Sequence, residues 1–341
     1  MNSVVGIDLG MGSIKVVALS QNQENCFLDL IGEAKTPRLE WYKTGGKKAM
    51  EEVAKVLKSL LKELKVDNRQ VVASLPESEV VSRQVSLPPL KENEIGDALK
   101  FEAETFVPYP LDQVSIDYEI METDDAGRLT VFAIAARNDL IGAYVKLFKM
   151  VGLEMMALES PAVSARRLIN QMGVSAESVM MFDIGEKFSD IISFKKGNIF
   201  FARSLPIGGE SITRAISVSL GLDMASAEEY KKAYGIREME LEGKIKNAIM
   251  PVFSSMAEEI RRAMALYTES FNKAVDLLML SGGGAKMPGL AEELTRVLGV
   301  EVQVIAPFLK IDVSRVVAPI DLNLDAYRFS LATGLALRGL K

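Results

Sequence analysis

The sequence contains no histidine and a single cysteine, Cys26, among 341 residues. Without imidazole groups there can be no Ser-His-Asp triad, no histidine metal site and no imidazole proton shuttle. One thiol cannot form an internal disulfide, which favours a reducing compartment. Catalysis, if there is any, must therefore use carboxylates, lysines, hydroxyls or a hard cation.

Long hydrophobic runs and a surplus of basic residues are also missing. Uncharged stretches such as residues 129–136 and 247–257 fall far short of the roughly 18 residues that a membrane span needs. No basic residue precedes Lys15, so we expect no signal peptide. The 40 Lys and Arg residues face 46 Asp and Glu residues, which argues against nucleic acid as a partner. These absences together predict a cytoplasmic protein.

The residues that are present indicate an α/β protein of two lobes. The chain is 48% hydrophobic and 25% charged, as in a globular protein, and its length suits two domains of about 150 residues. Residues 1–19 predict a β-hairpin that turns at Gly10-Met11-Gly12. A strand at 27–34, an amphipathic helix at 50–64 and a strand at 71–75 complete a ββαβ order.

Turn signals divide the chain into four parts. Prolines at 88, 89, 108 and 110 and a hairpin near Gly127 set off a small α+β insertion. We expect a first lobe at 1–84, 159–178 and 325–341, the insertion at 85–158, a second lobe at 179–210 and 273–324, and a helical subdomain at 211–272.

An internal repeat relates the two lobes. When residues 180–194 are aligned under the first hairpin, Asp8 falls on Asp183 and Gly10 on Gly185, at a constant offset of 175 residues (183 minus 8). Two similar lobes that face each other across a cleft follow from this repeat. Their Asp-x-Gly turns could then hold a polyphosphate from both sides.

The first turn carries the groups that phosphate and Mg²⁺ binding requires. Between Asp8 and Lys15 lie Gly10, Gly12 and Ser13, so carboxylate, backbone amides, hydroxyl and cation are close together. A tight hairpin without any ligand would show the same glycines. The segment is not a dinucleotide-binding fingerprint, because its third glycine is missing, and the sequence contains no P-loop.

A further glycine cluster lies near the end of the chain. Gly282, Gly283 and Gly284 follow an apolar strand at 277–280 and precede a helix expected near Pro288. A strand, a glycine turn and a helix N-terminus in that order are typical of an anion or nucleotide site. A flexible connection between strand and helix is the alternative.

These motifs resemble those of the actin, Hsp70 and sugar-kinase superfamily. Gly6-Ile7-Asp8-Leu9-Gly10, Phe182-Asp183-Ile184-Gly185 and Leu280-Ser281-Gly282-Gly283-Gly284 are similar to its phosphate-1, phosphate-2 and adenosine motifs. Within the superfamily the chain looks most like the PilM family of type IV pilus assembly proteins, relatives of FtsA. The insertion and the segment Ala227-Glu228-Glu229-Tyr230-Lys231 carry that closer resemblance.

The resemblance implies a duplicated, ribonuclease-H-like fold that binds ATP or ADP with Mg²⁺. Asp8 and Asp183 would hold Mg²⁺ through water. The residues implied in nucleotide binding are Asp8, Gly10, Gly12, Ser13, Ile14, Lys15, Asp183, Gly185, Glu228, Lys231, Gly282, Gly283, Gly284 and Lys286. The implied partners are the cytoplasmic N-terminal peptide of the inner-membrane protein PilN and other inner-membrane and motor components of the pilus machine. The protein would then lie at the inner face of the inner membrane, attached to it only through partners.

Departures from the superfamily pattern point to slow or absent hydrolysis. Glu186, Lys187 and Phe188 stand where relatives have further glycines and a threonine. Relatives often place a water-positioning glutamate directly before a proline, whereas Ser160 precedes Pro161 here. This leaves Glu159, one residue earlier, as the candidate catalytic group of a weak ATPase.

Two other functions fit the same fold. One is an FtsA-like or actin-like protein that self-associates into filaments, and the other is a small-molecule kinase. No additional aspartate in a glycine-rich turn supports the kinase. The segment 328–340, with small residues among larger apolar ones, predicts a helix that packs closely on the first lobe.

Overall fold

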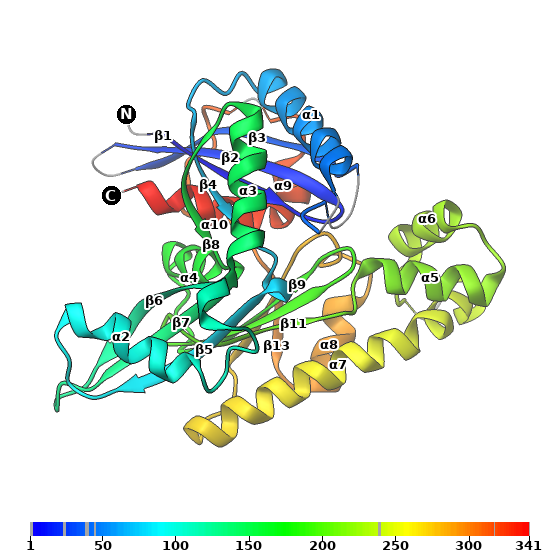
Figure 1. The fold of residues 1–341 in the computed structure, drawn as a ribbon. Helices are drawn as coiled ribbons and strands as arrows, with labels where there is room; N and C mark the ends of the chain where they lie inside the picture. Colours follow the sequence, from blue (N-terminus) through cyan, green and yellow to red (C-terminus); the bar gives the residue numbers. More distant parts are fainter. Residues whose placement is uncertain are drawn as a thin grey trace.

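The computed structural model describes residues 3–22, 25–37, 41–43, 46–237, 240–316 and 318–340. Two five-stranded sheets form the centres of two lobes, which lie one above the other in Figure 1. The first sheet has the order β3-β2-β1-β4-β8 and the second β11-β10-β9-β12-β13. Their strands are β1 (Ser3–Leu9), β2 (Ser13–Gln21), β3 (Cys26–Lys35), β4 (Gln70–Ser74), β8 (Glu154–Glu159), β9 (Ser178–Ile184), β10 (Ser189–Lys195), β11 (Asn198–Leu205), β12 (Leu277–Ser281) and β13 (Glu301–Val304).

The two sheets repeat each other in order and direction. In each, a hairpin is followed by a strand parallel to the hairpin's first strand: β1 pairs with β2 and β4, as β9 pairs with β10 and β12. Asp8 lies opposite Lys15 in the first hairpin, and Asp183 lies opposite Asp190 in the second. Both pairs are related by the offset of 175 (183 minus 8 and 190 minus 15), so the expected repeat is confirmed.

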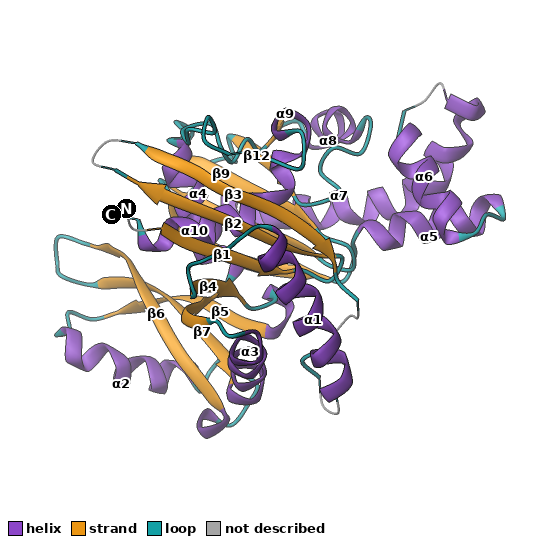
Figure 2. Ribbon diagram, turned by 90° about the horizontal axis from the view of Figure 1, so that it is seen from above, coloured by secondary structure: helices purple, strands orange, loops and turns teal. Residues whose placement is uncertain are grey.

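Helices cover these sheets and connect them. They are α1 (Lys47–Glu63), α2 (Glu92–Ala103), α3 (Asn138–Val151), α4 (Pro161–Met172), α5 (Gly209–Leu220), α6 (Met224–Tyr234), α7 (Lys244–Phe271), α8 (Leu290–Leu298), α9 (Leu322–Asp325) and α10 (Ser330–Ala336). Helix α4 begins where Ser160 accepts a hydrogen bond from the Ala162 amide and Pro161 occupies the first turn. Figure 2 shows α5 and α6 projecting from the end of the long helix α7, away from the sheets.

A third, antiparallel sheet lies beside the second lobe. Its order is β5-β7-β6, from strands β5 (Val80–Leu87), β6 (Val114–Thr123) and β7 (Leu129–Arg137). Helix α2 covers it with Ile95 and Leu99, which pack on Val131 and Ala133. These elements form the inserted unit seen at the left of Figure 1.

The packing gives this insertion an earlier start and an earlier end than residues 85–158. Helix α3 buries Leu140, Tyr144, Leu147 and Phe148 in the core that α1 and the first sheet share, and β8 pairs with β4. Both elements therefore pack with the first lobe. The insertion proper starts at Val80, which pairs with Ala136, so the chain enters and leaves it at one point.

The C-terminal segment packs closely on the first sheet, as its small residues predict. It forms a turn of 3₁₀ helix (Ala326–Phe329), then α10, then a second such turn (Leu337–Gly339). Helix α10 contacts both β1 and α4. A Cβ atom on Gly6 of β1 would lie against the Ala332 carbonyl and within 2.6 Å of the Ala336 amide nitrogen.

This close approach gives a stability prediction. Gly6→Ala should lower the free energy of unfolding by about 2 kcal/mol or more, because the new methyl group meets backbone atoms that cannot rotate away. Gly96→Ala in α2 is the matched control, since its methyl group would have no neighbour within 4 Å. That variant should be stabilised by about 0.5 to 1 kcal/mol. Urea unfolding of both variants measures the difference, and equal stabilities would contradict the packing.

The described residues include no helix that is long and apolar enough to cross a membrane.

Candidate nucleotide site

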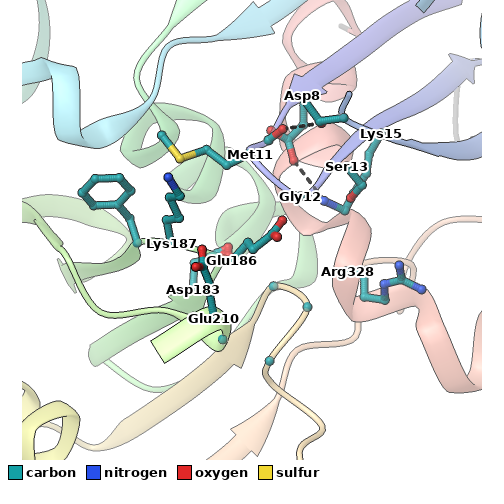
Figure 3. Close-up of a pocket in the computed structure, with 18 of the residues that line it drawn as sticks. Asp8, Met11, Gly12, Ser13, Lys15, Asp183, Glu186, Lys187, Glu210 and Arg328 are labelled. Atoms are coloured by element: carbon teal, nitrogen blue, oxygen red, sulfur yellow. Dashed lines mark hydrogen bonds and ion pairs between the residues drawn. The ribbon is translucent and has the colours of Figure 1, made fainter. Parts of the chain in front are cut away.

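A cavity of about 1590 Å³ lies between the two lobes. It exceeds the roughly 300 to 1,000 Å³ of common small-molecule sites, so a nucleotide would fit. The residues expected to bind nucleotide gather here, and those that line the cavity are Asp8, Gly10, Gly12, Ser13, Lys15, Asp183, Gly185, Glu228, Lys231, Gly282, Gly283, Gly284 and Lys286. Figure 3 shows Asp8, Ser13 and Lys15 from the first hairpin facing Asp183 and Glu186 from the second.

The two hairpin turns meet at the centre of the cavity. Lys15 Nζ lies 3.5 Å from Asp8 Oδ2, and the Thr36 hydroxyl donates to the Gly10 carbonyl at 2.7 Å. Gly12 lies against the Glu186 carboxylate, which would have to move aside for a side chain at this position. Glu186 of the second lobe therefore narrows the space between the two turns.

The glycine cluster at 282–284 forms the third wall. Gly282 has φ +78, and a Cβ atom there would lie 2.5 Å from Asp183 Oδ1 and 2.6 Å from the Ile184 carbonyl oxygen. Only glycine accommodates both the backbone angle and this contact. A Cβ atom on Gly283 would meet nothing within 4 Å, so the backbone of this turn borders open space.

Helices α5 and α6 supply a polar network at another wall. Lys231 Nζ lies 2.6 Å from Glu228 Oε2 and donates to Thr213 Oγ1 at 2.9 Å, while the Thr213 hydroxyl also donates to Glu228 at 2.6 Å. Burial raises the pKa of Glu228, but the hydrogen bonds from Lys231 and Thr213 outweigh it and hold the pKa below its usual value. The sequence did not single out Thr213; its signal is a threonine on the apolar face of α5, beside Ile212 and Ile216.

Four of the carboxyl groups that line the cavity have raised pKa values: Asp8, Asp183, Glu77 and Asp190. Burial raises the pKa of Asp183 to about 6, with the Asp8 charge adding to the effect and Lys15 opposing it. Burial also raises the pKa of Asp8. For Asp190, burial and then the Glu77 charge raise the pKa well above its usual value.

This arrangement fits a nucleotide that arrives with a cation. Buried carboxylates would repel a polyphosphate, whereas Mg²⁺ prefers oxygen ligands and bridges the two kinds of oxygen. Among the described residues, no group of three or more His, Cys, Asp or Glu side chains forms a complete metal site. A cation held mainly by phosphate oxygens and water, with Asp8 and Asp183 at its outer shell, suits these residues.

Glu77 and Asp190 are pocket residues that the sequence analysis did not identify. Asp190 is the repeat equivalent of Lys15, so the offset of 175 could have found it. Glu77 follows the carboxyl end of β4, just as Gly282 follows the carboxyl end of β12, and ligands bind at these strand ends in α/β proteins. Topology therefore contained the signal for Glu77.

Two expected residues lie outside the cavity lining. Ile14 is fully buried in the first-lobe core. Glu159, the candidate catalytic residue, is 6% exposed, and its carboxylate is bound by Arg167, at 2.9 Å, and by Arg338. These arginines hold Glu159 to α4 and the C-terminal turn, a placement that does not support the catalytic role. The neighbouring Ser160 donates instead to Glu77 Oε2 at 2.9 Å.

Glu77 gives a pH-dependent prediction. Its side chain is buried, and burial raises the pKa of this carboxyl to about 7 although the Ser160 hydroxyl opposes the shift. Between pH 4.5 and 7 the Glu77 carboxyl is therefore protonated in the folded state and ionised in the unfolded chain. The free energy of unfolding falls progressively as the pH rises through this range. Glu77→Gln should be more stable than the unchanged protein by about 2 kcal/mol or more at pH 8, and equal to it at pH 4.5. Urea unfolding without nucleotide tests this; a difference independent of pH would contradict it.

Comparison with known proteins agrees with this geometry. The profile of the family described as "Type IV pilus assembly protein PilM" matches residues 6–340. A solved "PilM-PilN type IV pilus biogenesis complex" contains a chain 26% identical to this one, with a TM-score of 0.87 over 99% of this chain and 98% of that one.

More distant similarities show the actin-like fold. The ethanolamine utilization protein EutJ from Carboxydothermus hydrogenoformans is 19% identical, with a TM-score of 0.57 over 99% of this chain and 90% of that one. MreB 5 of Spiroplasma citri, bound to AMPPNP, is 13% identical, with a TM-score of 0.56 over 98% and 95%. The cell division protein FtsA of Bacillus subtilis (strain 168) is 29% identical over 149 residues, which span about a third of its length (34%) and 38% of this chain.

The two-lobed α/β architecture expected from the sequence is thus confirmed as actin-like, and the family match extends over nearly the whole chain. This chain belongs to the PilM family of type IV pilus assembly proteins.

Proposed function

We propose that the chain is a nucleotide-binding adaptor of the type IV pilus machine. It binds Mg-ATP between its lobes, binds the cytoplasmic N-terminal peptide of PilN, and hydrolyses ATP slowly or not at all. Nucleotide binding is supported by the cavity between the lobes, which is lined by three separate turns and by the Glu228 and Lys231 ion pair. The family and the similar chain in a PilM-PilN complex support the adaptor part.

The described residues have distinct roles in this proposal. Backbone amides of the turns after β1, β9 and β12 would bind the phosphates, and Lys15 would add positive charge beside Asp8. The cation would neutralise phosphate charge, with Asp8 and Asp183 fixing its water ligands. Glu228 and Lys231 would contact the nucleoside, because their network joins α5 and α6 at the edge of the same cavity.

We expect slow hydrolysis because a carboxylate, that of Glu186, lies between the two hairpin turns. Gly12 contacts the Glu186 carboxylate, so a negative group occupies space beside the position of the phosphates. Glu159 is turned away by Arg167 and Arg338. A fast ATPase instead surrounds its transferring phosphoryl group with positive groups and a positioned water.

A direct test measures nucleotide binding and turnover separately. Equilibrium dialysis with Mg-ATP should give saturable binding at micromolar concentrations, while product formation over hours should stay near one turnover per site or less. Absence of Mg-ATP binding by the folded protein would contradict the cleft assignment. Rapid multiple turnover would contradict the slow-hydrolysis part and leave the binding part intact.

Self-association is the second candidate function that an observation favours. The partial match to FtsA and the fold shared with MreB 5 support it. Sedimentation with and without Mg-ATP distinguishes the two candidates: a filament former should pellet with nucleotide, whereas an adaptor should remain in the supernatant and bind the peptide one to one.

A further inference from the structure

Glu77 occupies a junction between the cavity and the inserted sheet. It lines the cavity, is 5% exposed, and accepts a hydrogen bond at 2.9 Å from Ser160. Among the described residues no arginine or lysine forms an ion pair with it, although buried carboxylates are usually paired. The Ala162 amide and the Ser82 side chain also hydrogen-bond to this carboxyl and, like Ser160, lower its pKa.

One covalent connection leads from Glu77 to β5. Glu77 begins the 3₁₀ turn η1 (Glu77–Glu79), and β5 starts at the next residue, Val80. Both η1 and β5 contact β11 of the second lobe, where Gln84 Nε2 donates to the Ile199 carbonyl at 3.4 Å. Because no linker separates the 3₁₀ turn from β5, a movement of Glu77 would also move β5, an outer strand of the insertion.

A second connection leads through α4 to β6. Ser160, which donates to Glu77, is also the N-cap of α4. One turn and a half further along α4, Arg166 binds Glu119 of β6 and donates to Asn198 at 3.1 Å. Asn198 in turn donates to the Met121 carbonyl at 2.9 Å. The other outer strand of the insertion is thus attached to the same junction.

We propose that Glu77 is the positioning residue that couples occupancy of the cavity to the inserted sheet. Phosphate oxygens and their cation would displace the Glu77 carboxyl from Ser160, and the two connections would carry the change to β5 and β6. The proposal rests on the proposed function, since it needs nucleotide in the cavity. The insertion would then have two states, one with Glu77 bound to Ser160 and one with Glu77 displaced. Coupling between two sites requires such a two-state element.

The test compares amide hydrogen exchange with and without Mg-ATP in the full chain. In the unchanged protein, Mg-ATP should alter exchange in β5 and β6 by about fivefold or more, the lower range of measured coupling. Glu77→Gln, measured at Mg-ATP concentrations that saturate its own site, should show less than about a twofold change in these strands. Glu79→Gln is the matched control, because its carboxyl lies in the same turn but outside the cavity lining. It should behave like the unchanged protein.

The outcomes separate this inference from the proposed function. No Mg-ATP binding by the unchanged protein contradicts the function itself. Binding with no exchange change in β5 and β6, or the same change in Glu77→Gln as in the unchanged protein, overturns the inference and leaves the function standing. Equal loss of the response in Glu77→Gln and Glu79→Gln also overturns it, because the whole turn rather than this carboxyl would then matter.

Discussion

Replacing residues 80–136 by a short Gly-Ser linker should abolish binding of the PilN N-terminal peptide and leave Mg-ATP binding within a few fold. The cut is feasible because Val80 pairs with Ala136, so the remaining ends are neighbours. It spares α3 and β8, which belong to the first-lobe core and sheet. Fluorescence anisotropy of a labelled peptide, with nucleotide binding measured on the same preparation, gives both quantities.

Two further measurements test this prediction even if the shortened protein is unstable. Phe132 and Met121 pack with the second-lobe core, so some loss of stability is expected and is measured by unfolding. In the full chain, saturating peptide should slow amide exchange in the insertion. Peptide binding by the folded, shortened protein, or protection confined to other regions, would place the partner site elsewhere.

Asp8→Ala and Asp183→Ala should each weaken Mg-ATP binding at least tenfold, equivalent to about 1.4 kcal/mol. Their carboxyls lie at equivalent positions of the two hairpins and face the same central space (Figure 3). In the proposed site each variant removes one of the carboxylates that would orient the water shell of the cation. Isothermal titration calorimetry with Mg-ATP measures the loss.

ATP binding measured without Mg²⁺ shows whether the two aspartates act through the cation or whether their substitution damages the site in general. In EDTA the same two variants should bind ATP as well as the unchanged protein or better, because each substitution removes a negative charge near the phosphates. Asp29→Ala, on β3 outside the cavity lining, is the control and should leave both affinities unchanged. Normal Mg-ATP binding by both Asp8→Ala and Asp183→Ala would show that the cleft is not the nucleotide site.

Features set by local pattern were predictable from the sequence. Alternating apolar residues around glycines predict both hairpins, and the register confirms them. The repeat then places Asp8 and Asp183 in equivalent turns, and the order of strand, glycines and helix singles out Gly282, Gly283 and Gly284, which line the same cavity. These positions depend on neighbours close in the chain or on the repeat, which a single sequence contains.

Features set by long-range partners were not predictable. The direction of the Glu159 carboxylate depends on Arg338, which lies 179 residues away in the sequence. Helix α3 has an apolar face that would suit either sheet, and only the pairing of β8 with β4 decides that it packs with the first lobe. For the same reason the hydrogen bond from Ser160 to Glu77, 83 residues apart in the sequence, could not be predicted.

Titration of the full chain with a labelled PilN N-terminal peptide, with and without Mg-ATP, tests the central claim most directly. The adaptor proposal predicts saturable, one-to-one binding of the peptide, with an affinity that differs between the two conditions. A folded protein that binds Mg-ATP but no peptide in either condition would contradict the adaptor proposal and favour the filament-forming alternative.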